Sequence, residues 1–189
     1  MQHLNDAQPC GRSDMIAQFF ASCRLSMHVP SFSSAPPSSP RLLRVVFIQR
    51  KPYQSASKAR RVGRILLNED AIMIRTSHAL PGASVQGARM ELLTQREQVS
   101  LLGGADVAIG MHGAGMVNVG FMRPGSRVIE IFPRHKRRWG YRNLCQYIGL
   151  RYADFRGGAD RGDGHKVVDP EEWSRFLSRW MHAAEDRDL

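Results

Sequence analysis

The sequence lacks the features that would mark a membrane span, a signal peptide or a disulfide framework. No apolar run approaches the length of about 20 residues that a membrane-spanning helix needs. Residues 1–14 are polar, so we expect no signal peptide within them. The cysteines Cys10, Cys23 and Cys145 are widely spaced and match neither a zinc site nor paired half-cystines. The remaining composition, with 42% hydrophobic residues, is that of an ordinary globular protein.

Acidic residues are also scarce. The chain holds 27 Lys and Arg against 17 Asp and Glu, which gives a formal net charge of +10. The excess is concentrated in residues 41–100 and in residues 123–142, where Glu130 is the single acid. Such an excess is typical of a solvated basic surface, a phosphate-binding cleft or a nucleic-acid face. The basic runs lack interleaved aromatic residues and any RNA-binding motif, so a nucleic-acid-binding module is kept only as an alternative.

The length of 189 residues suits one well-packed domain. Residues 1–40 are predicted to be a disordered or linker segment, with a short helix at about residues 15–26 and a Ser- and Pro-rich stretch after it. The folded domain is predicted over residues 41–189. We expect its strands at residues 42–48, 83–90, 107–110, 128–132 and 151–155, its helices at residues 71–76, 94–102, 117–122, 141–148 and from 169 onward, and a loop at residues 157–164. This alternation predicts an α/β fold, a Rossmann-like parallel sheet with helices on both faces.

A Gly-rich turn follows the strand predicted at residues 107–110. Its glycines allow the backbone to fold tightly and to direct N–H groups at an anion, and the helix after the turn adds its positive N-terminal dipole. The spacing is neither the dinucleotide fingerprint nor a P-loop. His112 lies at the turn and Glu130 near the end of the next strand. Ligands of open parallel sheets bind outside the carboxyl ends of the strands, so these two residues should line one crevice that fits a diphosphate.

Several sequence blocks, in their order along the chain, resemble the glycosyltransferases of family 61. The blocks are residues 45–50 (VVFIQR), 64–69 (RILLNE), 95–99 (QREQV), 105–110 (ADVAIG), 112–118 (HGAGMVN), 121–126 (FMRPGS), 128–130 (VIE) and 141–144 (YRNL). The resemblance therefore covers about residues 43–155. The family includes plant arabinoxylan xylosyl- and arabinosyltransferases and the animal O-linked N-acetylglucosaminyltransferases of the secretory pathway.

The resemblance implies a GT-B arrangement of two Rossmann-like halves, of which this chain would form the half that binds a UDP-sugar such as UDP-xylose or UDP-N-acetylglucosamine. It also implies an inverting transfer to a hydroxyl of a glycan or glycoprotein acceptor, in the Golgi or endoplasmic reticulum lumen. Only one half fits in 189 residues, so we expect the acceptor half and the family's membrane anchor to be missing. A truncated glycosyltransferase and an inactive nucleotide-sugar-binding remnant both stay open.

The resemblance and the local chemistry together nominate the turn as the donor site. His112 is expected to donate a hydrogen bond to a phosphate or sugar oxygen, and it is the candidate catalytic residue, with a role as base left open. Asn118 is expected to line the site or to cap the helix. The residues expected to bind through backbone N–H groups are Gly113, Ala114, Gly115 and Met116.

Three charged side chains complete the predicted site. Glu130 is expected to accept hydrogen bonds from both ribose hydroxyls, or alternatively to pair with Arg123, Arg127 or Arg134. Arg50 and Arg64 are candidates to neutralise the diphosphate leaving group, with surface solvation as their alternative.

No resident cofactor or metal is expected. No Asp-x-Asp motif follows a predicted strand, where it would point to a bound divalent metal, and Asp160 and Asp163 lie in a Gly-rich loop without supporting ligands. Arginine side chains and the helix dipole would supply the positive charge instead.

Overall fold

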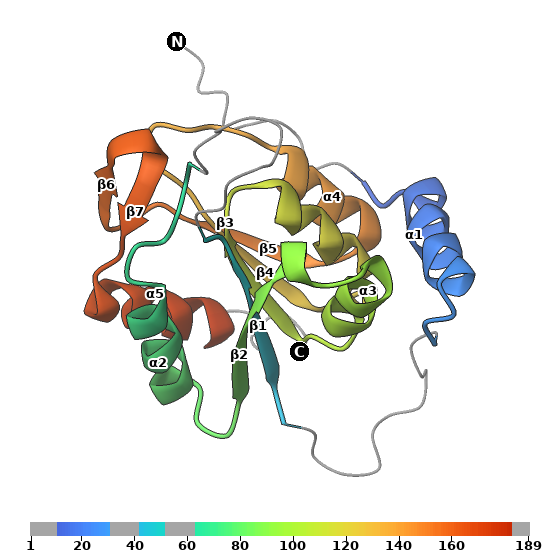
Figure 1. Ribbon diagram of the computed structural model, residues 1–189, viewed down its shortest axis with the longest axis horizontal. Coiled ribbons are helices and arrows are strands. Elements are labelled where there is room, and N and C mark those ends of the chain that lie inside the picture. The colour runs from blue at the N-terminus through green and yellow to red at the C-terminus, as the bar shows by residue number, and fades with distance from the viewer. Residues whose placement is uncertain (1–10, 31–41, 52–62, 183–189) are drawn as a thin grey trace.

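The computed structural model describes residues 11–30, 42–51 and 63–182. Five strands form one sheet in the order β2-β1-β3-β4-β5, and every neighbouring pair is parallel (Figure 1). The strands are β1 Arg44–Gln49, β2 Ser84–Arg89, β3 Val107–Met111, β4 Arg127–Ile131 and β5 Arg151–Phe155. The predicted parallel sheet is confirmed, and each predicted strand lies within two residues of its observed bounds.

Helices cover both faces of the sheet, because parallel strands can be joined only by crossover connections. One face carries α2 Glu69–Ala79 and α5 Pro170–His182 (Figure 1). The opposite face carries α3 Gln95–Gly103, η3 Ala114–Phe121 and α4 Gly140–Ile148. This arrangement confirms the predicted Rossmann-like α/β fold. Among the described helices, none combines the length and apolarity needed to cross a bilayer.

Strand β1 shows why two cores form. Side chains alternate between the two faces of a strand. Val45 and Phe47 accordingly pack in the core beneath α2 and α5, while Val46 and Ile48 pack in the core beneath α3, η3 and α4. All four side chains are buried. A continuous apolar run of this kind is what a strand covered on both faces requires.

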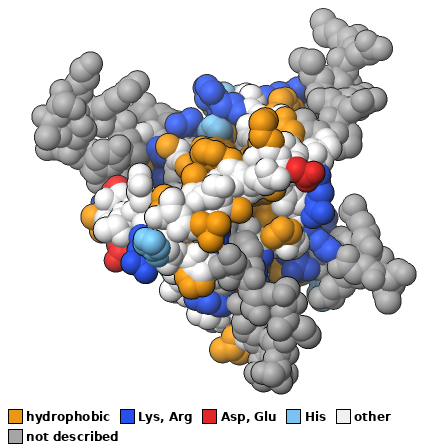
Figure 2. All heavy atoms as spheres, turned by 90° about the vertical axis from the view of Figure 1, so that its right-hand side faces the viewer, with side chains coloured by type: hydrophobic (Ala, Val, Ile, Leu, Met, Phe, Trp, Pro, Cys, Tyr) orange, Lys and Arg blue, Asp and Glu red, His pale blue; other side chains and the backbone are white. Residues whose placement is uncertain are grey.

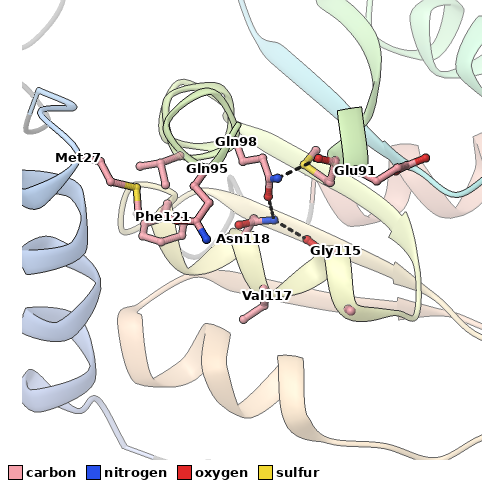
Figure 3. Close-up of a pocket in the computed structure, with 11 residues that line it drawn as sticks. Met27, Glu91, Gln95, Gln98, Gly115, Val117, Asn118 and Phe121 are labelled. Atoms are coloured by element: carbon pink, nitrogen blue, oxygen red, sulfur yellow. Dashed lines mark hydrogen bonds between the residues drawn. The ribbon is translucent and has the colours of Figure 1, made fainter. Parts of the chain in front are cut away.

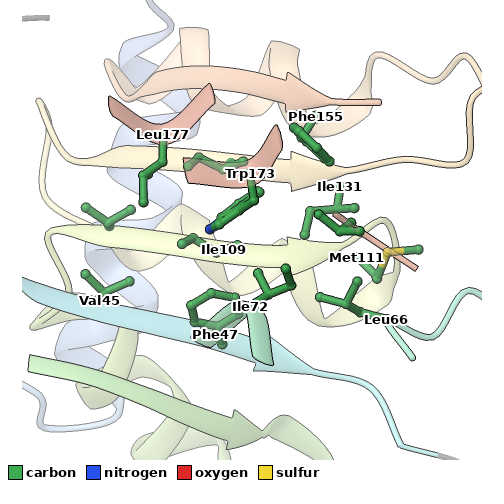
Figure 4. Close-up of a cluster of buried hydrophobic side chains, with 13 residues drawn as sticks. Val45, Phe47, Leu66, Ile72, Ile109, Met111, Ile131, Phe155, Trp173 and Leu177 are labelled. Atoms are coloured by element: carbon green, nitrogen blue, oxygen red, sulfur yellow. The ribbon is translucent and has the colours of Figure 1, made fainter. Parts of the chain in front are cut away.

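Trp173 anchors α5 to the sheet (Figure 4). Its side chain is fully buried, and its indole N–H donates to the hydroxyl of Thr76 on α2 at 2.8 Å. Its ring meets the ring of Phe155 edge to face, with 5.2 Å between the centroids. Phe176 and Trp180 pack against the same core.

Helix α1 Asp14–Ser26 packs on the face that carries η3 and α4 (Figure 1). The ring of Phe20 covers Gly120, where an added Cβ atom would lie only 2.1 Å from the ring. Arg24 is buried and donates from Nη1 to the carbonyl of Phe121 at 3.0 Å. The helix predicted at residues 15–26 is confirmed, and it is docked on the domain. The predicted disorder at residues 1–10 and most of the predicted linker, residues 31–41, lie outside the described residues.

Two local predictions are wrong. The helix expected at residues 117–122 begins at Ala114 and is a 3-10 helix, so no separate turn precedes it after Gly113. The loop expected at residues 157–164 contains part of a hairpin, formed by β6 Ala159–Arg161, the 3-10 turn η4 Gly162–Gly164 and β7 His165–Val167. The buried Lys166 on β7 explains this hairpin, because its ammonium donates to Asp160 on β6 at 2.8 Å.

We predict that Trp173→Ala lowers the free energy of unfolding by about 3 to 5 kcal/mol, because it removes a large buried ring and leaves a cavity between α2, α5 and the sheet. Urea unfolding followed by circular dichroism measures the change. Ile74→Ala is the control, because Ile74 lies on α2 but is 60% exposed. An equal loss in the two variants would contradict the packing described for Trp173.

Candidate functional site

The site lies where the chain reverses its direction across the sheet. After β1 the chain passes through α2 to β2, toward one edge of the sheet. After β3 it passes through η3 to β4, toward the opposite edge. The two connections leave a crevice outside the carboxyl ends of β1 and β3, here called the switch point, which is where open α/β sheets bind ligands. A cavity of about 270 Å³ opens there, lined by Ile48, Gln49, Arg50, Lys51, Arg64, Met90, Glu91, Ala114 and Gly115.

Arg50 lies directly against Gly113. A Cβ atom at residue 113 would come within 1.9 Å of the guanidinium Nη1, so only glycine leaves room for this contact. The Gly113 backbone is fully extended, with φ 175° and ψ 173°, which shows that its small size matters here and not a left-handed conformation. The other terminal nitrogen of Arg50, Nη2, donates to the carbonyl of Gly63 at 3.2 Å. The structure therefore joins the predicted Arg50 to the predicted Gly-rich turn.

The N–H of Met116, one of the four predicted backbone donors of the turn, is not available to a ligand. The N–H of Met116 donates to the carbonyl of Gly113 at 3.0 Å, so it is already used within the protein. The first N–H groups of a helix have no partner within the helix. Ala114 and Gly115 are the first two residues of η3, and both line the cavity. These two, and not Met116, are positioned to offer N–H groups to an anion.

Arg64 also lines the cavity. Its backbone lies in the left-handed region with φ 61°, which a residue with a side chain adopts at a cost of about 1 to 2 kcal/mol. Strain of this kind is concentrated at functional sites.

His112 and Glu130 contact each other directly. His112 follows β3, and its Nδ1 lies 2.5 Å from Oε1 of Glu130 on the neighbouring strand β4. The other oxygen of Glu130, Oε2, accepts a hydrogen bond from the hydroxyl of Tyr152 on β5 at 2.7 Å. A carboxylate can only accept, so Nδ1 carries the ring proton and Nε2 is the nitrogen that can face a ligand.

Two aromatic rings hold the imidazole of His112. Phe132 stacks on it with 4.7 Å between centroids, and Tyr141 lies at 5.7 Å on a tilted plane. Tyr141 also donates its hydroxyl proton to the carbonyl of Gly113 at 2.8 Å. The imidazole is therefore fixed by a carboxylate and by two rings.

Glu130 does not take the expected position at a ribose. Its side chain is fully buried, and its two oxygens serve His112 and Tyr152, so the structure leaves no space for a ribose at this carboxylate. The alternative ion pair with an arginine is also not formed with Arg123, which pairs with Asp106 at 2.5 Å. The role of Glu130 that the geometry supports is to orient His112.

Asn118 faces a second pocket, of about 390 Å³, on the other side of the turn (Figure 3). Its amide Nδ2 donates to Oε1 of Gln98 at 2.9 Å and to the carbonyl of Gly115 at 3.3 Å. Gln98 in turn donates to the carbonyl of Met90 at 2.8 Å. The pocket shares Met90, Glu91, Ala114 and Gly115 with the cavity at the switch point.

The family model described as Glycosyltransferase 61 matches residues 3–129 of this chain. The chain belongs to this family. A relative is a beta-1,2-xylosyltransferase of Arabidopsis thaliana, which is 23% identical over 156 residues. That match covers 76% of this chain and 28% of the relative, so the chain spans less than a third of the length of the relative it matches.

The sequence of this family 61 chain did not predict three residues of the site. Tyr152 binds Glu130, Tyr141 binds Gly113, and Gln98 binds Asn118. For Tyr152 the register of the sheet supplies the reason. Val128 pairs with Tyr152 in the register of β4 and β5, and alternation places Tyr152 on the same face as Glu130, two residues further along β4.

The buried surroundings of Glu130 perturb neighbouring acids. Burial, reinforced by the charge of Glu130, raises the pKa of Cys145 from 9.0 to about 12. The same two causes, together with the hydrogen bond to Glu130, raise the pKa of Tyr152. Burial and Glu130 likewise raise the pKa of Tyr141. Each of these groups stays neutral when folded at a pH at which the unfolded chain would begin to ionise.

We predict that the free energy of unfolding falls as the pH rises from about 9 to about 12. In this window the folded state keeps the Cys145 proton that the unfolded state loses, so the folded state binds more protons. The loss due to Cys145 is about 2 to 3 kcal/mol by about pH 11. Urea unfolding at a series of pH values measures it. Cys145→Ala should flatten the slope, whereas Cys23→Ala, on α1, should not; equal slopes in both variants would contradict the assignment.

Proposed function

We propose that this chain is the nucleotide-sugar-binding half of an inverting glycosyltransferase, with the donor diphosphate in the cavity at the switch point. The observation that carries the proposal is the placement of Arg50 against Gly113. This contact sets a guanidinium beside the first residues of η3, in a crevice at the carboxyl ends of two parallel strands. Exposed helix N–H groups and an arginine are what a diphosphate requires.

The charges around the cavity favour an anion. Arg50, Lys51 and Arg64 line it, and Glu91 is the one acid among its lining residues. Lys51 also pairs with the buried Glu69 at 3.0 Å, which holds its ammonium near the cavity. Negative charge that develops on the leaving diphosphate would be stabilised by these groups without a divalent metal.

The second pocket is suited to the base of the donor. Its apolar wall includes Met27, Met90 and Phe121, which can pack against a planar ring. The amides of Gln95 and Asn118 also line it and can pair with the N–H and C=O groups on the edge of a pyrimidine (Figure 3). Because the two pockets share four residues, one UDP-sugar can extend from one into the other.

His112 follows β3 and lines neither pocket, and it would reach the donor from the end of that strand. Nδ1–H donates to Glu130, so Nε2 is the nitrogen left for the donor; with a second proton on the ring, Nε2–H would donate to a phosphate or sugar oxygen. This hydrogen bond would stabilise the departing nucleotide in the transition state. An inverting transfer also needs a base that takes the proton of the acceptor hydroxyl, and that base must face the acceptor. His112 is therefore assigned to the donor, and the acceptor's base to another part of the whole protein.

The remaining features of the proposal come from the family. The donor sugar would be xylose or N-acetylglucosamine, the acceptor a glycan or glycoprotein, the architecture GT-B, and the location the Golgi or endoplasmic reticulum lumen. The relative's name as a beta-1,2-xylosyltransferase supports a pentose donor. Its greater length is consistent with an additional acceptor-binding half.

We predict that the 189-residue chain binds UDP at low salt and that Gly113→Ala weakens this binding about tenfold or more. The added methyl group displaces the Arg50 guanidinium, and a hydrogen bond to a charged group contributes about 1.5 to 3 kcal/mol. Isothermal titration calorimetry with UDP measures the change. Arg50→Ser should give a loss of similar size, because both variants remove the same cation from the cavity.

Gly140→Ala is the matched control for the glycine variant. Gly140 begins α4, and a Cβ atom there would meet no atom within 4 Å, so UDP binding should not change. Folded wild-type chain that does not bind UDP at low salt would overturn the proposal. Equal losses in Gly113→Ala and Gly140→Ala would overturn the role of Arg50.

We also predict that the chain alone shows no appreciable glycosyl transfer, although it binds the donor. Transfer needs an acceptor held in line with the anomeric carbon and a base on the acceptor side. A radiolabelled UDP-sugar assay against a panel of oligosaccharide and peptide acceptors tests this, with a version of the protein extended at its N-terminus run in parallel. Robust transfer by the 189-residue chain would contradict the prediction.

A further inference from the structure

A compact group of cations stands beside the proposed donor site. Residues 134–138, here called the basic loop, follow β4 and read Arg-His-Lys-Arg-Arg, and all five are exposed. The strand before the loop ends at the same edge of the sheet as β1 and β3. The loop therefore lies at the carboxyl edge, one strand beyond His112.

The backbone of the basic loop is held in place. The N–H of Arg134 donates to Oδ2 of Asp160 at 2.8 Å, and the guanidinium of Arg156 donates to the carbonyl of Lys136 at 2.5 Å. Just before the loop, the N–H of Phe132 donates to the carbonyl of Phe155 at 2.9 Å. These bonds fix the main chain while the cationic side chains extend into solvent.

The positive charge of the loop is only partly compensated within the protein. Asp154 pairs with Arg156 at 2.5 Å, and Asp160 pairs with Lys166 at 2.8 Å while it also accepts the backbone N–H of Arg134. His135 comes within 3.6 Å of Asp160. Within the described part of the chain, no carboxylate forms an ion pair with the remaining loop cations, which are Arg134, Lys136, Arg137 and Arg138. Four like charges in one exposed segment create a local positive potential that attracts an anion.

These cations do not belong to the donor pockets. None of them lines the cavity at the switch point or the second pocket. Between that cavity and the loop stands His112, whose imidazole stacks on Phe132 at the base of the loop. A ligand on the basic loop would thus approach His112 from the side opposite the diphosphate, which is the side where an acceptor must enter.

We propose that the basic loop is an acceptor subsite for an anionic glycan, one that carries carboxylate or sulfate groups near the hydroxyl that receives the sugar. This inference rests on the proposed function, because it takes His112 as the point where donor and acceptor meet. The nearby aromatic rings do not favour a nucleic acid. Phe132 is buried under Arg156, and the guanidinium of Arg142 lies over the ring of Trp139 at 4.4 Å, so arginine side chains already occupy the positions over these rings that stacked bases would take.

The test uses the whole 189-residue chain and trigalacturonate as the probe, with its neutral methyl ester as the matched ligand. We expect trigalacturonate to bind at low salt and its methyl ester not to bind. Arg137→Ser combined with Arg138→Ser should weaken binding about fivefold, because each exposed ion pair contributes about 0.5 kcal/mol. Arg175→Ser combined with Arg179→Ser, on the exposed face of α5, removes the same charge and should leave binding unchanged.

UDP binding is measured on the same samples. Unchanged UDP binding in the loop variant places the loop outside the donor site, as proposed, whereas a parallel loss of UDP would overturn the acceptor assignment. Equal weakening by the α5 variant, or tighter competition by a single-stranded oligonucleotide of equal charge, would also overturn it. A wild-type chain that binds trigalacturonate through the loop but does not bind UDP would retain the anion site and overturn the donor proposal instead.

Discussion

The reversal of the chain between β1 and β3 is the constraint on which the site depends. Parallel strands cannot be joined by a tight turn, so each connection must cross one face of the sheet. The connection after β1 crosses the face of α2, and the connection after β3 crosses the face of η3. The two chain segments therefore diverge, and the space between them is where Arg50 meets Gly113. A bulkier residue at 113 would fill that space.

A second organising feature is the buried carboxylate of Glu130. A buried charge is costly unless it is paired and hydrogen-bonded. Here the imidazole of His112 and the hydroxyl of Tyr152 satisfy one oxygen each. The three residues come from the ends or interiors of three adjacent strands, so the sheet itself sets their spacing. The orientation of His112 is thus supported by three adjacent strands of the sheet, while its remaining nitrogen is left to act on a ligand.

Positively charged side chains lie on both sides of His112 at the carboxyl edge of the sheet. On one side are Arg50, Lys51 and Arg64, which line a cavity with the N-terminus of η3. On the other side is the basic loop, which lines no described pocket and extends into solvent. Enclosed cations next to backbone donors suit a compact diphosphate, whereas exposed cations on a fixed backbone suit an extended anion. Part of the excess positive charge of the chain therefore lies at this edge, in an enclosed cavity and on an exposed loop.

Local features of the sequence determined most of the fold. The apolar runs at β1 and β3, the capping box formed by Thr94 and Glu97, and the left-handed Gly149 at the end of α4 each act within a few residues, so their effect can be read from neighbouring letters. The hairpin around Lys166 could not be read in this way, because a lysine there indicates a loop until Asp160 is known to pair with it.

At the site, the motifs brought attention to Arg50, His112 and the Gly-rich turn, but the tertiary structure decided what each group contacts. Glu130 was expected to face a ribose, and it is buried against His112 and Tyr152. Met116 was expected to offer its N–H, and Gly113 already accepts it. For Glu130 the choice of partner depends on strand register and on which face of the sheet a side chain occupies. Those relations join residues about 20 positions apart, and they are set only when the strands pair.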